Sequence, residues 1–91
     1  MSYKIFETDE FKKDLNKLST KIQTKLYTKL NPSVYKILCN EPHFGNNIKK
    51  LKDYEPPTWR YRIGDYRIFY NIDEKNKVVV ITAISDRKDA Y

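Results

Sequence analysis

The sequence predicts a single α+β domain, residues 1–91, in which two N-terminal helices pack on one face of a twisted antiparallel sheet. Apolar residues recur at helical spacing between residues 11 and 38, and beyond residue 58 they alternate as in strands. Helices and strands that are segregated along the chain in this way favour an α+β arrangement. A length of 91 residues and a hydrophobic content of 40% fit one globular core.

The first 40 residues predict one strand followed by two helices. Residues 2–7 read as a short strand, and Thr8 is suited to cap a first helix. Ser19 or Thr20 can cap a second helix, in which Pro32 predicts a kink or a short break. The apolar positions of the two helices are Phe11, Leu15, Leu18, Ile22, Leu26, Leu30, Val34, Ile37 and Leu38.

The second half predicts four more strands, which gives the order β-α-α-β-β-β-β. Glu41-Pro42 ends the helical region, and Gly64-Asp65 supplies a two-residue hairpin turn. A longer turn covers residues 73–76, and the last strand is apolar on both faces, so we expect it to lie inside the sheet. The strands are expected at residues 48–52, 59–63, 66–73 and 77–85.

The two-residue turn fixes the register of the hairpin and sets Arg62 directly opposite Arg67. Opposed residues share one face of a sheet, so both arginines lie with Arg60 on the face away from the helices. Tyr61, Ile63, Tyr66, Ile68 and Tyr70 then form the core side of the hairpin. Opposed like charges destabilise a sheet by up to about 1 kcal/mol. A bound anion would offset that cost, and phosphate suits the planar guanidinium best.

The composition supports a polyanionic partner. The chain has 18 Lys and Arg residues and a net charge of +6, yet only four of these residues are arginines. Three of the four belong to the hairpin, and arginine is preferred over lysine where a bidentate phosphate contact is needed. The alternative is a solvated sheet face whose arginines pair with acidic neighbours. Those neighbours would be Glu55, Asp65 and Asp73.

Other features predict a cytoplasmic protein without membrane segments, metal or cofactor. The single cysteine, Cys39, allows no disulfide within the chain and fits a reducing compartment. The charged N-terminus resembles no secretory signal, and the longest apolar run, residues 78–84, is too short to span a bilayer. Cys39 and His43 are too few to form a closed metal site.

The segments WRYRIGDYRIFYNID (59–73) and VVVITAISDRKDAY (78–91), together with NIKKLK (47–52), resemble the RelE family of toxin–antitoxin ribonucleases. The resemblance covers nearly the whole chain. It implies a fold similar to that of small microbial ribonucleases. It also implies a small cytoplasmic toxin that cuts mRNA in the ribosomal A site and is silenced by a cognate acidic, RelB-like antitoxin.

The resemblance also implies roles for individual residues. Arg67 would steady the scissile phosphate, Arg87 would protonate the leaving group, and Tyr91 would stack on or orient the substrate base. Arg62 joins this catalytic set. Some family members have lysine where this chain has Arg60 and Arg62, and arginine does not lose its proton, so the general base stays open. The candidate bases are Lys52, Glu55 and Tyr91, and the expected substrate-binding residues are Lys50, Lys52 and Arg60.

The residue inventory also suggests how an RNA-cleaving enzyme would work here. Attack by the RNA 2′-hydroxyl needs no metal, but it needs a base, charge stabilisation and an acid. The sequence has ample positive charge but no histidine pair, and His43 lies in the loop after the helices. We therefore expect an enzyme that depends on the ribosome to orient its substrate. The alternatives are a ParE-type toxin that inhibits DNA gyrase without catalysis, and a plain nucleic-acid-binding module.

Overall fold

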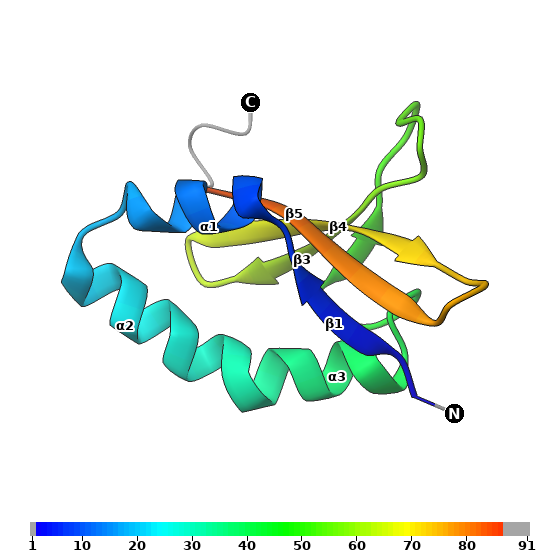
Figure 1. Ribbon diagram of the computed structural model, residues 1–91, viewed down its shortest axis with the longest axis horizontal. Coiled ribbons are helices and arrows are strands. Elements are labelled where there is room, and N and C mark those ends of the chain that lie inside the picture. The colour runs from blue at the N-terminus through cyan, green and yellow to red at the C-terminus, as the bar shows by residue number, and fades with distance from the viewer. Residues whose placement is uncertain (1, 87–91) are drawn as a thin grey trace.

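The computed structural model describes residues 2–86, and Figure 1 shows its helices and strands. The helices are α1 (Asp9–Asn16), α2 (Thr20–Lys29) and α3 (Tyr35–Asn40), and a kinked segment, Leu30–Val34, joins α2 to α3. The strands are β1 (Lys4–Glu7), β2 (Ile48–Lys50), β3 (Trp59–Ile63), β4 (Tyr66–Asp73) and β5 (Val78–Asp86). None of the helices within residues 2–86 is long and apolar enough to cross a membrane.

The five strands form one sheet in the order β1-β5-β4-β3-β2, which confirms the α+β prediction and the interior position of β5. All neighbouring strands are antiparallel except β1 and β5, which run parallel. Thr8 fixes this parallel pair, because its backbone N–H and its side-chain hydroxyl both donate to the carbonyl of Ile81, at 3.1 and 2.8 Å. The same hydroxyl accepts from the N–H of Phe11 at 3.1 Å and so caps α1 as predicted.

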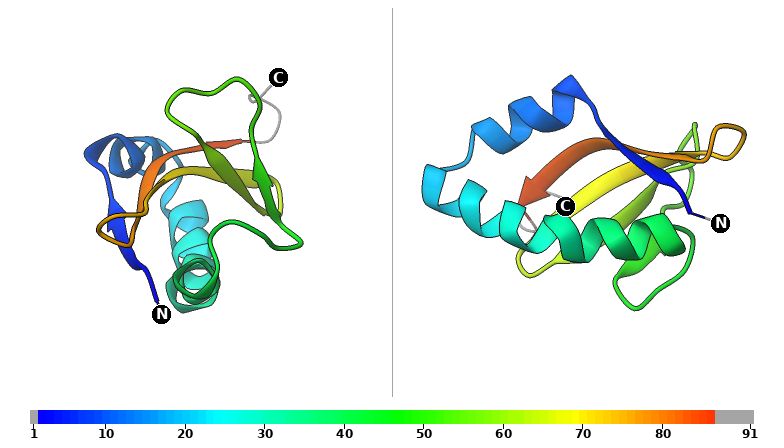
Figure 2. Two further views of the ribbon diagram at one scale, coloured as in Figure 1. Left: turned by 90° about the vertical axis from the view of Figure 1, so that its right-hand side faces the viewer. Right: turned by 60° about the horizontal axis from the view of Figure 1, so that its bottom comes forward.

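The helix from residue 20 to residue 40 bends at the expected place. Asn31 leaves the helical region, with φ −117° and ψ 116°, because the following Pro32 disfavours helical backbone in the residue before it. Ser19 caps the start of α2, where its Oγ accepts from the N–H of Ile22 at 3.3 Å. Figure 2 (left) shows α2 and α3 together beneath one face of the sheet.

The core lies between these helices and that face of the sheet, which we call the covered face. Of the five hairpin residues predicted to point inward, four are buried, and Tyr66 is half-buried beside the turn. The buried cluster comprises Phe11, Leu15, Leu26, Leu30, Val34, Leu38, Tyr61, Ile63, Ile68, Tyr70, Val79, Ile81 and Ile84. The opposite face of the sheet is not covered by α2 or α3, and we call it the open face.

A β-bulge in β5 changes which residues of that strand reach each face. Phe69 pairs with Ala83 and Tyr70 pairs with Ile81, so Thr82 is the extra residue. The hydroxyl of Thr82 donates to the carbonyl of Phe69 at 3.1 Å. Because of this insertion, Ile81 and Ile84 are both buried although they are three residues apart.

Candidate nucleic-acid interface

The hairpin between β3 and β4 sets two arginines side by side, as predicted. Gly64 has a φ of +57°, which a two-residue turn requires at its first central position and which glycine adopts without strain. The resulting register pairs Ile63 with Tyr66 and Arg62 with Arg67. Both arginines therefore project from the open face.

The open face holds two rows of side chains that run across the strands. The first row crosses β3, β4 and β5 and consists of Arg62, Arg67 and Ser85. The second row begins on β2 and consists of Lys49, Arg60, Phe69 and Ala83. Four cationic residues are thus gathered at the β2–β4 end of the open face, and we call Lys49, Arg60, Arg62 and Arg67 the cationic patch.

Acidic neighbours do not neutralise the exposed part of this patch. Within residues 2–86, the side chains of Arg60 and Arg62 form no ion pair with any carboxylate. Arg60 instead donates from Nη1 to the carbonyl of Asn47 at 3.2 Å, and the backbone N–H of Arg62 donates to the same carbonyl at 3.0 Å. The carboxylate of Asp73 accepts from Asn76 in its own turn. The patch is therefore available to an external anion at Arg60 and Arg62.

Of the expected substrate-binding lysines, Lys50 is not brought to the cationic patch. It pairs with Trp59, and its Nζ lies 5.3 Å from the centroid of that ring, on the side of the sheet opposite to Arg60. Lys49 stands on the open face in its place. Lys52 and Glu55 are exposed in the loop between β2 and β3. Arg87 and Tyr91 lie outside the described residues.

The loop between β2 and β3 rises from the sheet on the side away from α2 and α3 (Figure 2, left). Asn71, on the open face of β4, anchors the end of this loop that leads into β3. The side-chain amide of Asn71 donates to the carbonyl of Pro57 at 2.9 Å and to the hydroxyl of Thr58 at 3.1 Å. This anchor was not predictable from the sequence, because an asparagine within a strand gives no local sign of a partner in another loop.

His43 belongs to a separate cluster on the covered side of the sheet. Its Nδ1 lies 2.8 Å from Oε2 of Glu41 and its Nε2 contacts Oε2 of Glu74, whose other oxygen accepts from the hydroxyl of Tyr3 at 2.8 Å. These contacts, first that with Glu74 and then that with Glu41, raise the pKa of His43 above its ordinary value. The ring also packs edge-on against Trp59, 5.8 Å between centroids. The structure thus keeps the histidine away from the arginines.

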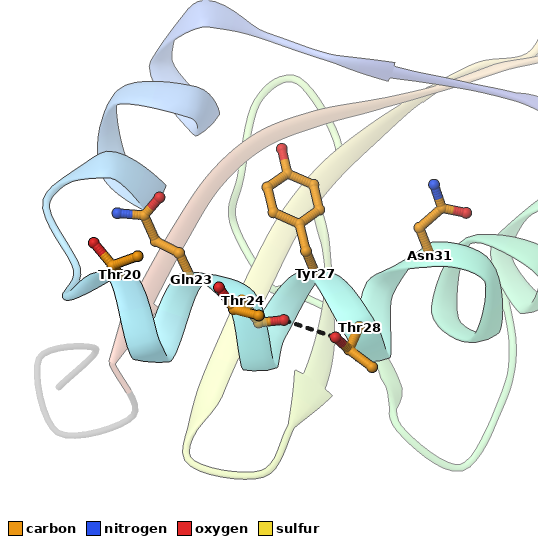
Figure 3. A pocket seen from close by; sticks show the side chains of 6 residues that line it. All are labelled: Thr20, Gln23, Thr24, Tyr27, Thr28 and Asn31. Atoms are coloured by element: carbon orange, nitrogen blue, oxygen red, sulfur yellow. Dashed lines mark hydrogen bonds between the residues drawn. The ribbon is translucent and has the colours of Figure 1, made fainter.

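A broad hollow on the outer side of α2 offers no comparable chemistry. Its volume is about 490 Å³, and Figure 3 shows its lining side chains. They are polar and uncharged: Thr20, Gln23, Thr24, Tyr27, Thr28 and Asn31. The cationic patch is therefore the stronger candidate for a functional site.

Comparison with known proteins agrees with this geometry. The sequence model of the ParE toxin of type II toxin–antitoxin systems matches residues 5–91. No curated protein matches the sequence at a significant level.

Solved toxin structures share the fold over almost the entire chain. The RelBE2 toxin–antitoxin complex from Mycobacterium tuberculosis is 28% identical, with a TM-score of 0.72, and the match covers 96% of this chain and 100% of that one. The archaeal RelE–RelB complex from Pyrococcus horikoshii OT3 is 26% identical, with a TM-score of 0.70 and coverage of 99% and 100%.

The free E. coli toxin RelE, in a doubly substituted form, shares the same fold at 20% identity and a TM-score of 0.69, with coverage of 99% and 88%. A family match over residues 5–91 and these RelE structures lead to the same assignment. This chain belongs to the ParE toxin family of type II toxin–antitoxin systems and has the fold of the RelE/ParE superfamily.

Proposed function

We propose that this toxin is a ribosome-dependent endoribonuclease that cleaves mRNA in the A site by attack of the RNA 2′-hydroxyl. The observation that supports the proposal most is the opposed pair Arg62 and Arg67 on the open face. Two guanidinium groups at adjacent positions suit a phosphate whose negative charge increases in the transition state. Sequence identity of 26–28% to RelE-type toxins over at least 96% of the chain adds to this support.

In the proposed reaction, Arg67 and Arg62 stabilise the charge on the scissile phosphate, and Arg60 binds a neighbouring phosphate. Lys49 replaces Lys50 as the lysine of β2 that we assign to the RNA backbone, because Lys49 shares the face of Arg60. Arg87 is assigned to the leaving oxygen and Tyr91 to the substrate base. Lys52, Glu55 and Tyr91 are the candidates for the base that takes the proton of the 2′-hydroxyl.

We propose ribosome dependence because the chain has one histidine and therefore no histidine pair for acid–base catalysis. Within residues 2–86 the only histidine is His43, which lies on the covered side with Glu41 and Glu74. The cationic patch can stabilise charge, but it contains no histidine or carboxylate that could act as a general base. If the ribosome already holds the mRNA in a reactive orientation, the toxin has to supply less acid–base catalysis. Such positioning lowers the activation barrier of cleavage by several kcal/mol.

The silencing partner of a type II toxin is its antitoxin, and two of the similar structures are RelB complexes of RelE-type toxins. We propose an acidic, RelB-like antitoxin that covers the cationic patch or displaces residues 86–91. Charge complementarity favours this choice, because the chain has a net charge of +6. The proposed location of toxin and antitoxin is the cytoplasm, where the ribosomes are.

The second candidate function is inhibition of DNA gyrase without catalysis. It is favoured by the family match, which is to ParE rather than to RelE. In that case the cationic patch would contact the gyrase–DNA complex or would have no direct role.

One pair of assays separates the two functions. Cleavage sites are mapped on mRNA bound to purified ribosomes, with and without the toxin, and supercoiling by purified gyrase is measured at the same toxin concentrations. We expect A-site cuts whose rate falls by about 10²–10³ with Arg67→Ala, and unchanged supercoiling. Intact mRNA together with inhibited supercoiling would overturn the proposal in favour of the second function.

A further inference from the structure

Phe69 is an aromatic residue of the sheet that does not belong to the core. Its neighbours in β4, Ile68 and Tyr70, are both fully buried, so the alternation of the strand places Phe69 on the open face. Its side chain is half-buried and is absent from the apolar cluster under the helices. A ring in this position contributes little to the core.

The surroundings of Phe69 combine positive charge with a small neighbour. Arg60 is its partner on β3, and Arg67 is two residues away along β4 on the same face. Ala83 is its partner on β5, where the bulge at Thr82 sets the register. Alanine is short, so on the β5 side the ring has no large cross-strand neighbour.

This combination is what single-stranded nucleic acid requires. Proteins that bind single strands pair a cationic groove for the backbone with aromatic rings on which bases stack. Residues two apart in a strand are separated by about 6.6 Å, so a phosphate at Arg67 and a base at Phe69 can belong to the same or to adjacent nucleotides.

We propose that Phe69 is a base-stacking platform, which holds a nucleobase of the mRNA flat beside the phosphate bound by Arg62 and Arg67. The inference rests on the proposed function and deepens it, because it assigns the position of a base relative to the cationic patch. Asn71, two residues further along β4 on the same face, anchors the loop between β2 and β3 at Pro57 and Thr58. Stacking accepts every base, so this contact supplies affinity and orientation rather than a strict sequence preference.

The test uses three variants of the full chain and a short single-stranded RNA that contains one 2-aminopurine, whose fluorescence is quenched when it stacks. Phe69→Leu removes the aromatic ring but keeps an apolar side chain, and Phe69→Trp keeps an aromatic face. Phe44→Leu is the matched control, because Phe44 is 78% exposed and lies in the loop after α3. Urea unfolding of each variant checks that the fold is retained.

We expect Phe69→Leu to bind the RNA about 10-fold to 100-fold more weakly and to lose the quenching, because stacking on one ring contributes on that scale. Phe69→Trp should bind and quench like the wild type, and Phe44→Leu should be unchanged. On programmed ribosomes, Phe69→Leu should raise the toxin concentration needed for half-maximal cleavage by a similar factor.

The two hypotheses fail in different ways. If Phe69→Leu binds and quenches like the wild type while the ribosomal mRNA is still cut, the platform is wrong and the proposed function stands. If quenching depends on Phe69 but the wild type cuts no ribosomal mRNA, the platform stands and the proposed function is wrong. Loss of antitoxin binding alone in Phe69→Leu, with unchanged RNA affinity, would overturn the platform and make Phe69 an anchor for the antitoxin.

Discussion

The two faces of the sheet are built from the same three strands but have opposite compositions. On the covered face, β3, β4 and β5 present buried residues such as Tyr61, Ile68 and Ile81. On the open face, the residues between them include Arg60, Arg67 and other polar or charged side chains. Because alternation in a strand assigns neighbours to opposite faces, stability and function are expected to separate from one residue to the next.

The most direct test of the difference between the two faces is to truncate one side chain on each face of β4. Ile68→Ala, on the covered face, should lower the free energy of unfolding by about 2–5 kcal/mol, because it leaves a cavity in the core. Phe69→Ala, on the open face, should lower it by about 1 kcal/mol, the span of strand preferences, because its half-buried ring lies outside the core. Urea unfolding at equilibrium measures both values. Equal losses would show that the open face is part of the core.

The next largest effect is expected on activity at Arg67. Arg67→Ala should lower the single-turnover cleavage rate by about 10²–10³, as loss of a charge-stabilising donor does. Arg67→Lys should restore only part of the rate, since lysine lacks the planar fork of donors. Both are measured with mRNA on programmed ribosomes, and the unfolding transition serves as the control. Full activity of Arg67→Lys would show that a point charge is sufficient.

A smaller, local effect is expected at Asn71, which joins the open face to the loop between β2 and β3. Asn71→Ala should remove two hydrogen bonds and cost about 1–3 kcal/mol, at about 0.5–1.5 kcal/mol for each bond. Amide hydrogen exchange should become faster in residues 51–58. Asn76→Ala, which loosens the turn before β5, is the control and should leave exchange in residues 51–58 unchanged. The prediction fails if both variants affect that loop alike.

The smallest effect is a pH dependence of stability that arises on the covered side, at His43. Its raised pKa means that its stabilising contacts are complete below its ordinary pKa of 6.5 and are lost as the pH rises through the raised value. Contacts with His43 lower the pKa values of Glu41 and Glu74, so their contribution is complete above 4.5 and is lost at lower pH.

The melting temperature of the wild type should therefore be highest between about pH 4.5 and 6.5 and should fall towards pH 8. His43→Gln should remove the decline above pH 6.5. Thermal unfolding followed by circular dichroism from pH 4 to pH 8 tests this. An unchanged decline in the variant would assign the pH dependence to other groups.

The elements with local signals were predictable from the sequence. The Gly64-Asp65 turn gave the register of the arginine pair, and Thr8, Ser19 and Pro32 marked the helix boundaries and the kink. In each case the determining chemistry lies within a few residues of the feature. The predicted α+β class followed from the spacing of apolar residues, which is helical between residues 11 and 38 and alternating beyond residue 58.

Features that depend on distant partners were not predictable in this way. The parallel pairing of β1 with β5 joins residues more than 70 positions apart. The bulge at Thr82 is not marked by glycine, proline or any other turn residue at that position. In the predicted strand 48–52 the apolar residues Ile48 and Leu51 are three apart, so strand alternation did not decide whether Lys49 or Lys50 faces the arginines. Pairing with β3 decides it in favour of Lys49.

The central claim is that the arginines of the open face, and not the basic charge of the whole chain, give this toxin its activity. A charge-matched comparison tests it most directly. One double variant is Arg62→Gln with Arg67→Gln, and the other is Lys21→Gln with Lys36→Gln, two exposed lysines on α2 and α3. Both lose two positive charges. Single-turnover cleavage of ribosome-bound mRNA should fall by about 10² or more in the arginine variant. It should stay within a few-fold of wild type in the lysine variant. Equal losses in the two variants would contradict the claim and reduce the cationic patch to part of a generally basic surface.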